Sequence, residues 1–215
     1  MKDLYIVGAG GCGRETLVLL QDINRIQGPQ WNIRGFLDDT EDPLHGKACD
    51  VGVAGSIQDY SPRPNDVLVM AVANPADKKM LAQMLKGRGA HFVSAIHPYA
   101  NMGQHCTIGE GILVQAGFGM TVNVTVGSFV TLLSACVGHD VSIGDYTTIS
   151  SHCNISGNVA IGAEVFMGGN VAVAPRTSIG SQSYLCMGSV VLKDVSPGVK
   201  VLGNPAREIG IASSN

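Results

Sequence analysis

A six-residue hydrophobic period runs through the sequence from about residue 95 towards its C-terminal region. Aliphatic side chains recur at every sixth position in one phase and, after a break, in a second phase. The first phase comprises Ile96, Met102, Ile108, Val114, Met120, Val126 and Leu132, and the second comprises Ile143, Ile149, Ile155, Ile161, Met167, Val173, Ile179, Leu185 and Val191. A repeat of this length indicates a hexapeptide β-solenoid, in which successive coils stack and bury one continuous core.

Aliphatic–glycine pairs recur once in each coil. They occur at Ile108-Gly109, Val126-Gly127, Ile143-Gly144, Ile161-Gly162 and Ile179-Gly180, so their spacings are 18, 17, 18 and 18 residues. Three hexads make one triangular coil of 18 residues, and the 17-residue coil contains His139. Because departures from local regularity tend to mark functional or strained positions, we expect this deletion to tighten the corner at His139 and turn its side chain out of the stack. A tolerated loop deletion is the alternative.

Residues 1–94 lack the six-residue period and alternate between strand and helix patterns. We expect strands over residues 4–7, 33–37 and 67–72, a helix from about Arg14, and a second helix from Pro75, a residue suited to a first helical turn. This βαβ order predicts a parallel sheet. The region is long enough for only half of a dinucleotide-binding fold, so we expect two domains, residues 1–94 and 95–215.

The charge pattern excludes some partners and favours others. The net charge is -3, charged residues make up 14% of the chain, and lysine and arginine form no run, so nucleic acid and membrane surfaces are poor candidates. Charged residues are sparse in the predicted solenoid. Between Ala95 and Arg207 they are Glu110, Asp140, Asp145, Glu164, Arg176, Lys193, Asp194, Lys200 and Arg207. Faces with so few charges are expected to be covered by further copies of the chain.

The cysteines indicate which metal or disulfide sites to expect, and the N-terminal segment indicates the cellular compartment. The six cysteines include no CxxC pair, so neither a zinc site nor a disulfide framework is indicated, and we expect small buried apolar residues and no metal. The apolar run at residues 4–7 is too short for a signal peptide or a membrane span. We therefore expect a cytoplasmic protein.

A glycine-rich turn follows the first predicted strand. Gly8-Ala9-Gly10-Gly11-Cys12-Gly13 matches GxGxxG between a strand and a helix, where backbone amides can approach a phosphate. Asp38 and Asp39, at the end of the second predicted strand, can accept hydrogen bonds from a ribose or a base. The pattern indicates a nucleotide, and the half-sized region disfavours NAD. A turn that only packs the helix on the sheet is the alternative.

Among the six histidines, His139 is the candidate catalyst. An imidazole titrates near neutrality and can take a proton from an amine or a hydroxyl, and a carboxylate can select its tautomer. Asp140 is the adjacent carboxylate, but neighbouring residues on a strand point to opposite faces, so it reaches His139 only where the chain bends. We expect His152 to be structural, and the histidines show no metal-ligand spacing.

Taken together, GAGGCGRE, FLDD, the hexads, VGHDVSIGDYTTIS and VLGNPAR resemble the NeuD/PglD family of bacterial sugar acyltransferases over nearly the whole chain. The resemblance implies a Rossmann-like half domain that binds a nucleotide-sugar, followed by a left-handed parallel β-helix. It further implies a homotrimer with acetyl-CoA in the groove between adjacent helices. The expected reaction is transfer of an acetyl group to an amino group of a nucleotide-linked sugar, for glycan or polysaccharide biosynthesis.

The resemblance also assigns residues to roles. His139 is implied as the general base and Asp140 as its acidic partner. The residues implied for acetyl-CoA are Gly157, Gly169, Met187, Gly188 and Arg207, and those implied for the acceptor are Gly8, Gly10, Gly11, Gly13, Arg14, Asp38, Asp39 and Asn74.

Two positions depart from the family pattern and leave the acceptor open. Relatives that act on nucleotide-linked amino sugars can carry a histidine where this chain has Thr148, and many have histidine in place of Cys12. O-acetylation of sialic acid or another sugar hydroxyl is therefore an alternative, as is a non-catalytic nucleotide-sugar-binding solenoid. We expect direct transfer, because Cys136 and Cys153 show no basic partner that would make either a nucleophile.

Overall fold

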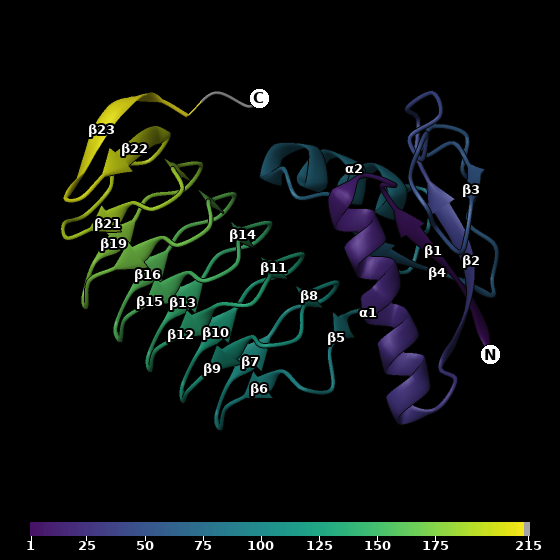
Figure 1. Ribbon diagram of the computed structural model, residues 1–215, viewed down its shortest axis with the longest axis horizontal. Helices are drawn as coiled ribbons and strands as arrows, with labels where there is room; N and C mark the ends of the chain where they lie inside the picture. The colour runs from purple at the N-terminus through teal and green to yellow at the C-terminus, as the bar shows by residue number, and fades with distance from the viewer. Residues whose placement is uncertain (213–215) are drawn as a thin grey trace.

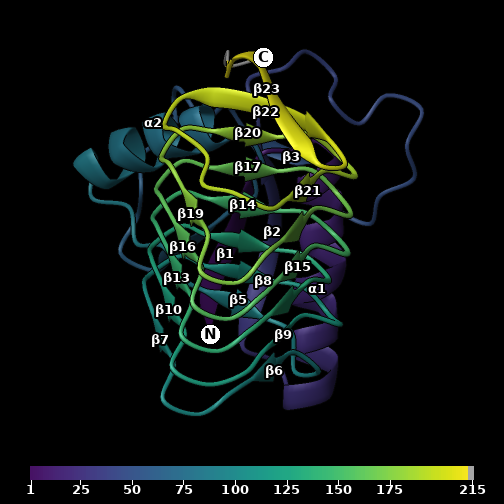
Figure 2. The same ribbon diagram turned by 90° about the vertical axis from the view of Figure 1, so that its left-hand side faces the viewer.

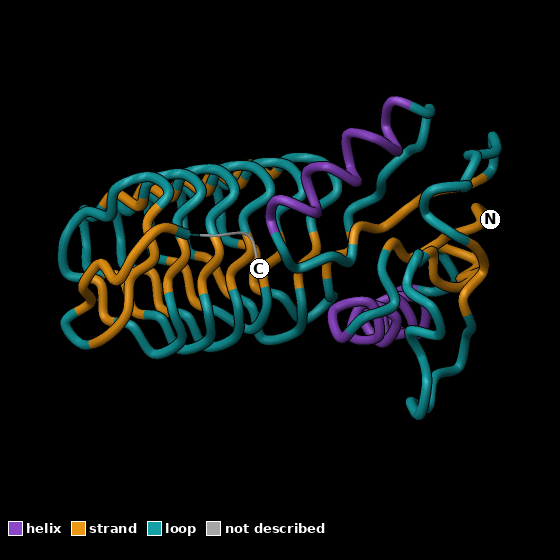
Figure 3. Tube along the Cα trace, turned by 90° about the horizontal axis from the view of Figure 1, so that it is seen from above, coloured by secondary structure: helices purple, strands orange, loops and turns teal. Residues whose placement is uncertain are grey.

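The computed structural model describes residues 1–212, which form an N-terminal α/β unit followed by a β-solenoid (Figure 1). Within these residues the α/β unit holds a parallel sheet in the order β3-β2-β1-β4. Its elements are β1 (Lys2–Val7), α1 (Gly11–Gln27), β2 (Trp31–Leu37), β3 (Val53–Gly55), β4 (Asp66–Met70) and α2 (Pro75–Gly87). α1 packs on one face of the sheet and α2 on the other (Figure 3).

The strands and helices expected in this unit are present with shifted bounds. α1 begins at Gly11 rather than Arg14, and β4 ends at Met70 rather than at residue 72. The pattern does not indicate β3, because a three-residue edge strand carries too little periodicity. Val18 on α1 and Met80 on α2 are more than half exposed, although both lie among the apolar residues of their helices.

Strands of the solenoid form three faces of a triangular prism, a left-handed parallel β-helix as expected (Figure 2). The docking sheet, which faces the α/β unit, consists of β5 (Ala95–Ile96), β8 (Leu113–Val114), β11 (Thr131–Leu132), β14 (Thr148–Ile149), β17 (Phe166–Met167), β20 (Tyr184–Leu185), β22 (Val199–Gly203) and β23 (Ala206–Ile211). The second sheet consists of β6 (Asn101–Met102), β9 (Gly119–Met120), β12 (Cys136–Val137), β15 (Asn154–Ile155), β18 (Ala172–Val173) and β21 (Val190–Val191). The third sheet consists of β7 (Thr107–Ile108), β10 (Thr125–Val126), β13 (Ser142–Ile143), β16 (Ala160–Ile161) and β19 (Ser178–Ile179).

The 17-residue coil is real, but its missing residue does not lie at His139. Strand β12 pairs with β9 at an offset of 17 residues (Gly119↔Cys136) and with β15 at an offset of 18 (Cys136↔Asn154). The deletion therefore lies at residues 133–135, where β11 and β12 are joined by three residues instead of four. His139 lies in the next corner, residues 138–141, which has the regular length. The expectation that the deletion tightens the His139 corner is wrong.

Regular four-residue corners place their third residue in the left-handed region of backbone space. In the corners between the second and third sheets, called the second corners, these residues are His105, Asn123, Asp140, Asn158 and Arg176, with φ between 56 and 61°. Left-handed backbone at this position turns the chain from one face of the prism to the next. Asp140 therefore does not follow the strand alternation that would separate its side chain from that of His139.

The α/β unit packs against the docking sheet. Ala95 and Leu113 of that sheet join the core formed by β1, β4 and α1. Phe129, in the corner before β11, contacts Phe92 edge-to-face with ring centroids 5.1 Å apart. The unit is thus held on one side of the prism, behind the docking sheet in Figure 2. None of the described helices is long and apolar enough to cross a membrane.

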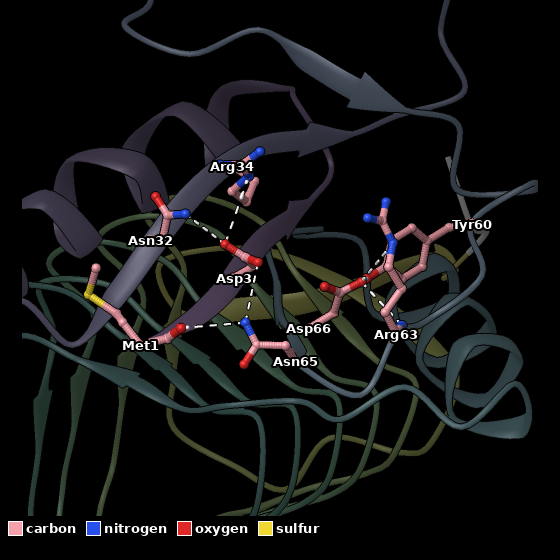
Figure 4. Close-up of polar contacts among 8 residues, drawn as sticks. All are labelled: Met1, Asp3, Asn32, Arg34, Tyr60, Arg63, Asn65 and Asp66. Carbon is pink, nitrogen blue, oxygen red and sulfur yellow. Dashed lines mark hydrogen bonds and ion pairs between the residues drawn. The ribbon is translucent and has the colours of Figure 1, made fainter.

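A polar cluster lies where β1 and β4 begin (Figure 4). Asp3 accepts hydrogen bonds from Asn32 at 2.6 Å and from Asn65 at 3.3 Å, and the buried Asp66 accepts one from the hydroxyl of Tyr60 at 2.8 Å. Because the strands are parallel, this cluster closes the edge opposite the glycine-rich turn. The carboxyl edge of the sheet is the one that carries the candidate nucleotide residues.

Candidate active site

His139 stands at one end of a three-residue hydrogen-bonded chain that runs through Asp140 to Asn123. Its Nδ1 lies 2.7 Å from Oδ2 of Asp140, and Nδ2 of Asn123 donates to Oδ1 of Asp140 at 3.1 Å. These hydrogen bonds, from His139 first and Asn123 second, lower the pKa of the Asp140 carboxyl. Because an ionised carboxylate only accepts, Nδ1 carries the proton and Nε2 keeps a lone pair. Asn123 is a participant that the sequence pattern did not reveal, although it is the left-handed residue of the preceding second corner.

Gly157 lies against the His139 ring. A Cβ atom added at Gly157 would be 2.5 Å from both Cε1 and Nε2 of the imidazole, closer than real contacts allow. Its φ does not lie in the left-handed region, so close approach rather than backbone conformation requires glycine here. His139 and Gly157 thus occupy equivalent positions in the second corners of consecutive coils. His139 supplies the imidazole, and Gly157, which has no side chain, leaves space for it. The side chain of His139 is 56% exposed.

The glycine-rich turn is held tightly at two glycines and is open at two others. Gly8 has a φ of +98°, and a Cβ at Gly13 would be 2.0 Å from the Gly8 carbonyl oxygen. A Cβ placed at Gly10 or Gly11 would have no heavy atom within 4 Å apart from those of the adjacent residues and of the backbone of α1. The first pair therefore builds the turn, while the second pair leaves the backbone at the N-terminus of α1 open to a ligand.

The acidic residues after β2 take different positions. Oδ2 of Asp38 accepts a hydrogen bond from the backbone amide of Ala9 at 2.6 Å, so Asp38 lies at the glycine-rich turn. Arg14 donates to the carbonyl of Ala9 at 3.3 Å and lies there too. Asp39 instead accepts from the hydroxyl of Ser56 at 2.6 Å and points towards the β3 side of the sheet.

Asn74 caps α2 and opens a cleft against the docking sheet. Its side-chain oxygen accepts hydrogen bonds from the amides of Ala76 at 2.9 Å and Asp77 at 3.2 Å. The cleft has a volume of about 530 Å³ and is lined by Asn74, Pro75, Ala76, Glu164, Phe166, Gln182, Ser183, Tyr184, Gly198, Ile211 and Ala212. It joins the carboxyl edge of the α/β sheet to the C-terminal half of the solenoid.

Two stacked aromatic rings form the floor of this cleft. Phe166 and Tyr184 are paired residues on β17 and β20, with ring centroids 4.9 Å apart and planes 15° apart. Nζ of Lys200 lies 4.9 Å from the Tyr184 centroid. These residues were not among those predicted from the sequence. The available signal was two aromatic residues 18 positions apart, each preceding an interior residue of the six-residue period.

The residues predicted to bind acetyl-CoA lie at three separate places on the solenoid. Gly169, Met187 and Gly188 lie in the corners between the docking and second sheets, where Gly188 donates to the Gly169 carbonyl at 2.9 Å. Gly157 lies in a second corner, and Arg207 lies on β23 beside a separate cavity. The second corners lie across the prism from the α/β unit. A single chain therefore does not bring His139 together with the glycine-rich turn.

The cysteines divide between structural and exposed positions. Cys153 is buried, and burial raises the pKa of its thiol. Cys136 is exposed on the second sheet and the other four cysteines are half-buried, so the expectation that the cysteines are buried holds only for Cys153. Among residues 1–212, no group of three histidine, cysteine, aspartate or glutamate side chains lies close enough together to hold a metal ion.

Comparisons with known proteins agree with this architecture along the whole chain. Residues 3–85 match the PglD N-terminal domain family. GDP-perosamine N-acetyltransferase of Escherichia coli O157:H7 is 29% identical over 217 aligned positions, which cover 96% of each chain. WeeI from Acinetobacter baumannii AYE is 27% identical with a TM-score of 0.85, and the alignment covers 97% of this chain and 100% of that one.

A further solved relative carries a ligand. The acetyltransferase domain of PglB from Neisseria gonorrhoeae FA1090, in complex with acetyl coenzyme A, is 26% identical with a TM-score of 0.83, and the alignment covers 97% of this chain and 99% of that one. An α/β unit of the PglD type and a prism shared along the full length are common to these proteins. Residues 3–85 therefore match the PglD N-terminal domain family, and the chain as a whole is similar in fold to these acetyltransferases.

Proposed function

We propose that this protein transfers the acetyl group of acetyl-CoA to an amino group of a nucleotide-linked sugar, with His139 as the general base. The observation that carries the proposal is the Asn123–Asp140–His139 chain, which leaves Nε2 of an exposed imidazole able to accept a proton. The named activity of the Escherichia coli relative and the acetyl-CoA complex of the PglB domain support the same reaction class.

Direct transfer accounts for the residues around the imidazole. The sugar amine attacks the thioester carbonyl while Nε2 of His139 takes its proton, so a C–N bond forms and the carbonyl oxygen becomes an oxyanion. As the oxyanion collapses to the amide, the C–S bond breaks and the CoA thiolate leaves. Asp140 holds Nδ1 and stabilises the imidazolium, and Asn123 holds Asp140. The backbone amide of Gly157 is the donor that we assign to the oxyanion. The imidazolium then returns its proton to the thiolate, and neither Cys136 nor Cys153 is needed.

We assign the nucleotide to the α/β unit and the sugar to the aromatic cleft. Gly10 and Gly11 at the N-terminus of α1 offer open backbone to a diphosphate, and Asp38 lies beside them. The cleft begins at Asn74, on the same edge of the sheet, and its stacked rings suit the apolar face of a sugar. This assignment divides the chain into a nucleotide-sugar domain, residues 1–94, and an acyltransferase domain, residues 95–215. Since acetyl-CoA is a cytoplasmic metabolite, we place the reaction in the cytoplasm.

A homotrimer completes the site in this proposal. His139 and the glycine-rich turn lie on opposite sides of one prism, so the imidazole of one protomer has to reach the cleft of its neighbour. Apolar side chains remain exposed on the prism, including Val122 in a second corner at 41%, Met187 at 70% and Leu192 at 57%. Light scattering should give three times 22.4 kDa. A monodisperse monomer would contradict the assembly.

Thiol release from acetyl-CoA tests the reaction. Acceptors are GDP-perosamine, further nucleotide-linked amino sugars, the matched sugars with a hydroxyl in place of the amine, and sialic acid. Turnover is expected with an amino sugar and not with its hydroxyl counterpart. Turnover with hydroxyl acceptors alone would make the protein an O-acetyltransferase. Binding of a nucleotide-sugar without any turnover would make it a binding protein.

A further inference from the structure

One lysine is completely buried where the α/β unit meets the solenoid. Lys78 lies on the apolar face of α2, is 0% exposed, and donates from Nζ to Oγ1 of Thr148 at 2.7 Å, Oγ1 of Thr131 at 2.9 Å and the carbonyl of Thr147 at 3.4 Å. Thr131 and Thr148 are paired residues on neighbouring strands of the docking sheet. Three oxygen acceptors match the three N–H bonds of an ammonium group.

Packing alone does not account for a lysine here. A methionine would fill similar space without removing a charge from water, and the three oxygens that accept from Nζ are neutral, with no carboxylate among them. Burial lowers the pKa of Lys78 to about 7, and Cys12 on α1 is the ionisable neighbour that acts on it. What lysine adds is therefore a set of directed hydrogen bonds across the boundary between the two regions.

These hydrogen bonds continue to the cleft. Oγ1 of Thr148, which accepts from Lys78, also donates to the carbonyl of Ala73 at 2.6 Å. Ala73 immediately precedes Asn74, which caps α2 and lines the cleft. Thr148 is also paired with Phe166, the first aromatic residue of the cleft floor. One hydroxyl thus lies between the wall of the cleft, at Asn74, and its floor, at Phe166.

We propose that Lys78 is a positioning residue for the nucleotide-sugar: with Thr131 and Thr148 it holds the start of α2 against the docking sheet and so sets the width of the aromatic cleft. The inference rests on the proposed function, because it assigns the cleft to the acceptor. Lys78 does not touch the acceptor, since it is fully buried and does not line the cleft. It acts through Ala73 and Asn74.

The same helix offers a matched control. Lys86, two turns after Lys78, also bridges α2 to the solenoid, through an ion pair with Glu110. Both partners are more than two fifths exposed, and neither lines the cleft. A Lys86→Met variant therefore removes a contact between the same two regions at the surface, far from the hydroxyl of Thr148.

Steady-state kinetics with GDP-perosamine and acetyl-CoA separate the roles. Lys78→Met and Thr148→Val are each expected to raise the KM for the nucleotide-sugar by about tenfold, with the KM for acetyl-CoA unchanged, because a small displacement of the cleft wall affects only the acceptor. Thr148→Ser keeps the hydroxyl and should retain the wild-type KM, as should Lys86→Met. Equal KM values in Lys78→Met and Lys86→Met would overturn the proposal.

A double variant distinguishes positioning from simple stability. Lys78→Met with Thr131→Val leaves no unpaired partner, because the Thr148 hydroxyl still donates to Ala73 and the Thr147 carbonyl still accepts from the Thr131 amide, so resistance to urea should recover relative to Lys78→Met while the KM for the nucleotide-sugar stays raised. Recovery of both quantities would reduce Lys78 to a structural contact.

Hydrogen exchange gives a readout that needs no substrate. The amides over residues 73–78 should exchange faster in Lys78→Met than in Lys86→Met or the wild type, and equal rates would overturn the proposal. An inactive wild-type protein would refute the proposed function, and the exchange rates would still decide the role of Lys78.

Discussion

The two regions of this protein form their parts of the site in different ways. In the α/β unit the candidate nucleotide residues act through backbone, because Gly8 needs a positive φ and Gly13 has no room for a side chain. In the solenoid the candidate catalytic residues act through side chains on corners whose backbone repeats in every coil. Substitutions at Gly8 and Gly13 should therefore affect folding, whereas substitutions of the catalytic side chains on the solenoid corners should affect chemistry alone.

The largest expected effect is that of removing the base. His139→Ala should lower kcat by about two to four orders of magnitude with little change in acetyl-CoA affinity, because a proton acceptor acts in the transition state. Steady-state kinetics and calorimetry measure the two quantities. His152→Asn is the control, since asparagine tolerates the positive φ of 62° at that corner. An His139→Ala protein that keeps more than about a tenth of wild-type turnover would end the assignment.

A pair of glycine substitutions tests the backbone side of the comparison. Gly13→Ala places a Cβ 2.0 Å from the Gly8 carbonyl and should lower the free energy of unfolding by more than about 3 kcal/mol in urea titrations. Gly10→Val meets open space, so it should keep the fold but block the approach of a phosphate and raise the nucleotide-sugar KM. If Gly10→Val weakens acetyl-CoA binding instead, the roles of the two regions are reversed.

The boundary between the regions should make stability depend on pH. In the folded protein Lys78 releases its proton at a pH of about 7, whereas in the unfolded chain it does so near 10.5, so the unfolded state holds more protons in between. The free energy of unfolding should therefore rise from pH 7 to 9, by at most about 1.4 kcal/mol per pH unit from this group. Burial raises the pKa of Cys12, so its thiol stays protonated in the folded protein over this window. Lys78→Met should remove the slope, and a slope that survives would belong to another group.

A smaller effect on kcat is expected at Gly157, where the absence of a side chain leaves room for the His139 ring. Gly157→Ala would bring a methyl group to 2.5 Å from Cε1 and Nε2 of His139, so the ring has to move. We expect kcat to fall by about tenfold with unfolding unchanged, because a misplaced base loses alignment but keeps its chemistry. Gly87→Ala, at the end of α2 with no heavy atom within 4 Å of the added Cβ, is the control. Loss of stability without loss of rate would show that Gly157 serves the fold.

The smallest effect concerns the short corner. Inserting one glycine after Ser134 restores four residues between β11 and β12 and leaves the His139 corner unchanged. The kcat of the insertion variant should stay within about twofold of wild type, since the geometry of the base is preserved. A tenfold loss would show that the short corner positions His139 after all.

Sequence patterns predicted the solenoid better than the α/β unit, for a physical reason. A six-residue repeat reports the same burial environment many times, so one exceptional residue does not obscure it. Each helix shows its apolar pattern only once, and the apolar residues of α1 and α2 include the exposed Val18 and Met80. Lys78 could not be found in this way, because a buried lysine contradicts the hydrophobic pattern that identifies a core.

For the candidate site, the sequence pointed to His139, Asp140 and Gly157, which the structure brings together, but not to Asn123. The deletion drew attention to the correct coil although it lies one corner earlier. Asn123, Phe166 and Tyr184 depend on which residues stack in neighbouring coils, and that register is a property of the folded prism. Whether the predicted acetyl-CoA residues act together depends on a second copy of the chain.

The repeating left-handed residue of the second corners has an evolutionary consequence. This residue turns the chain in the same way in every coil, so the fold depends little on the residue before it. In this chain that preceding position holds Gln104, Val122, His139, Gly157 and Pro175 in succession. New chemistry can therefore arise there by single substitutions without a new backbone. Such a scaffold lets a lineage change its acceptor or its reaction while the architecture is inherited intact.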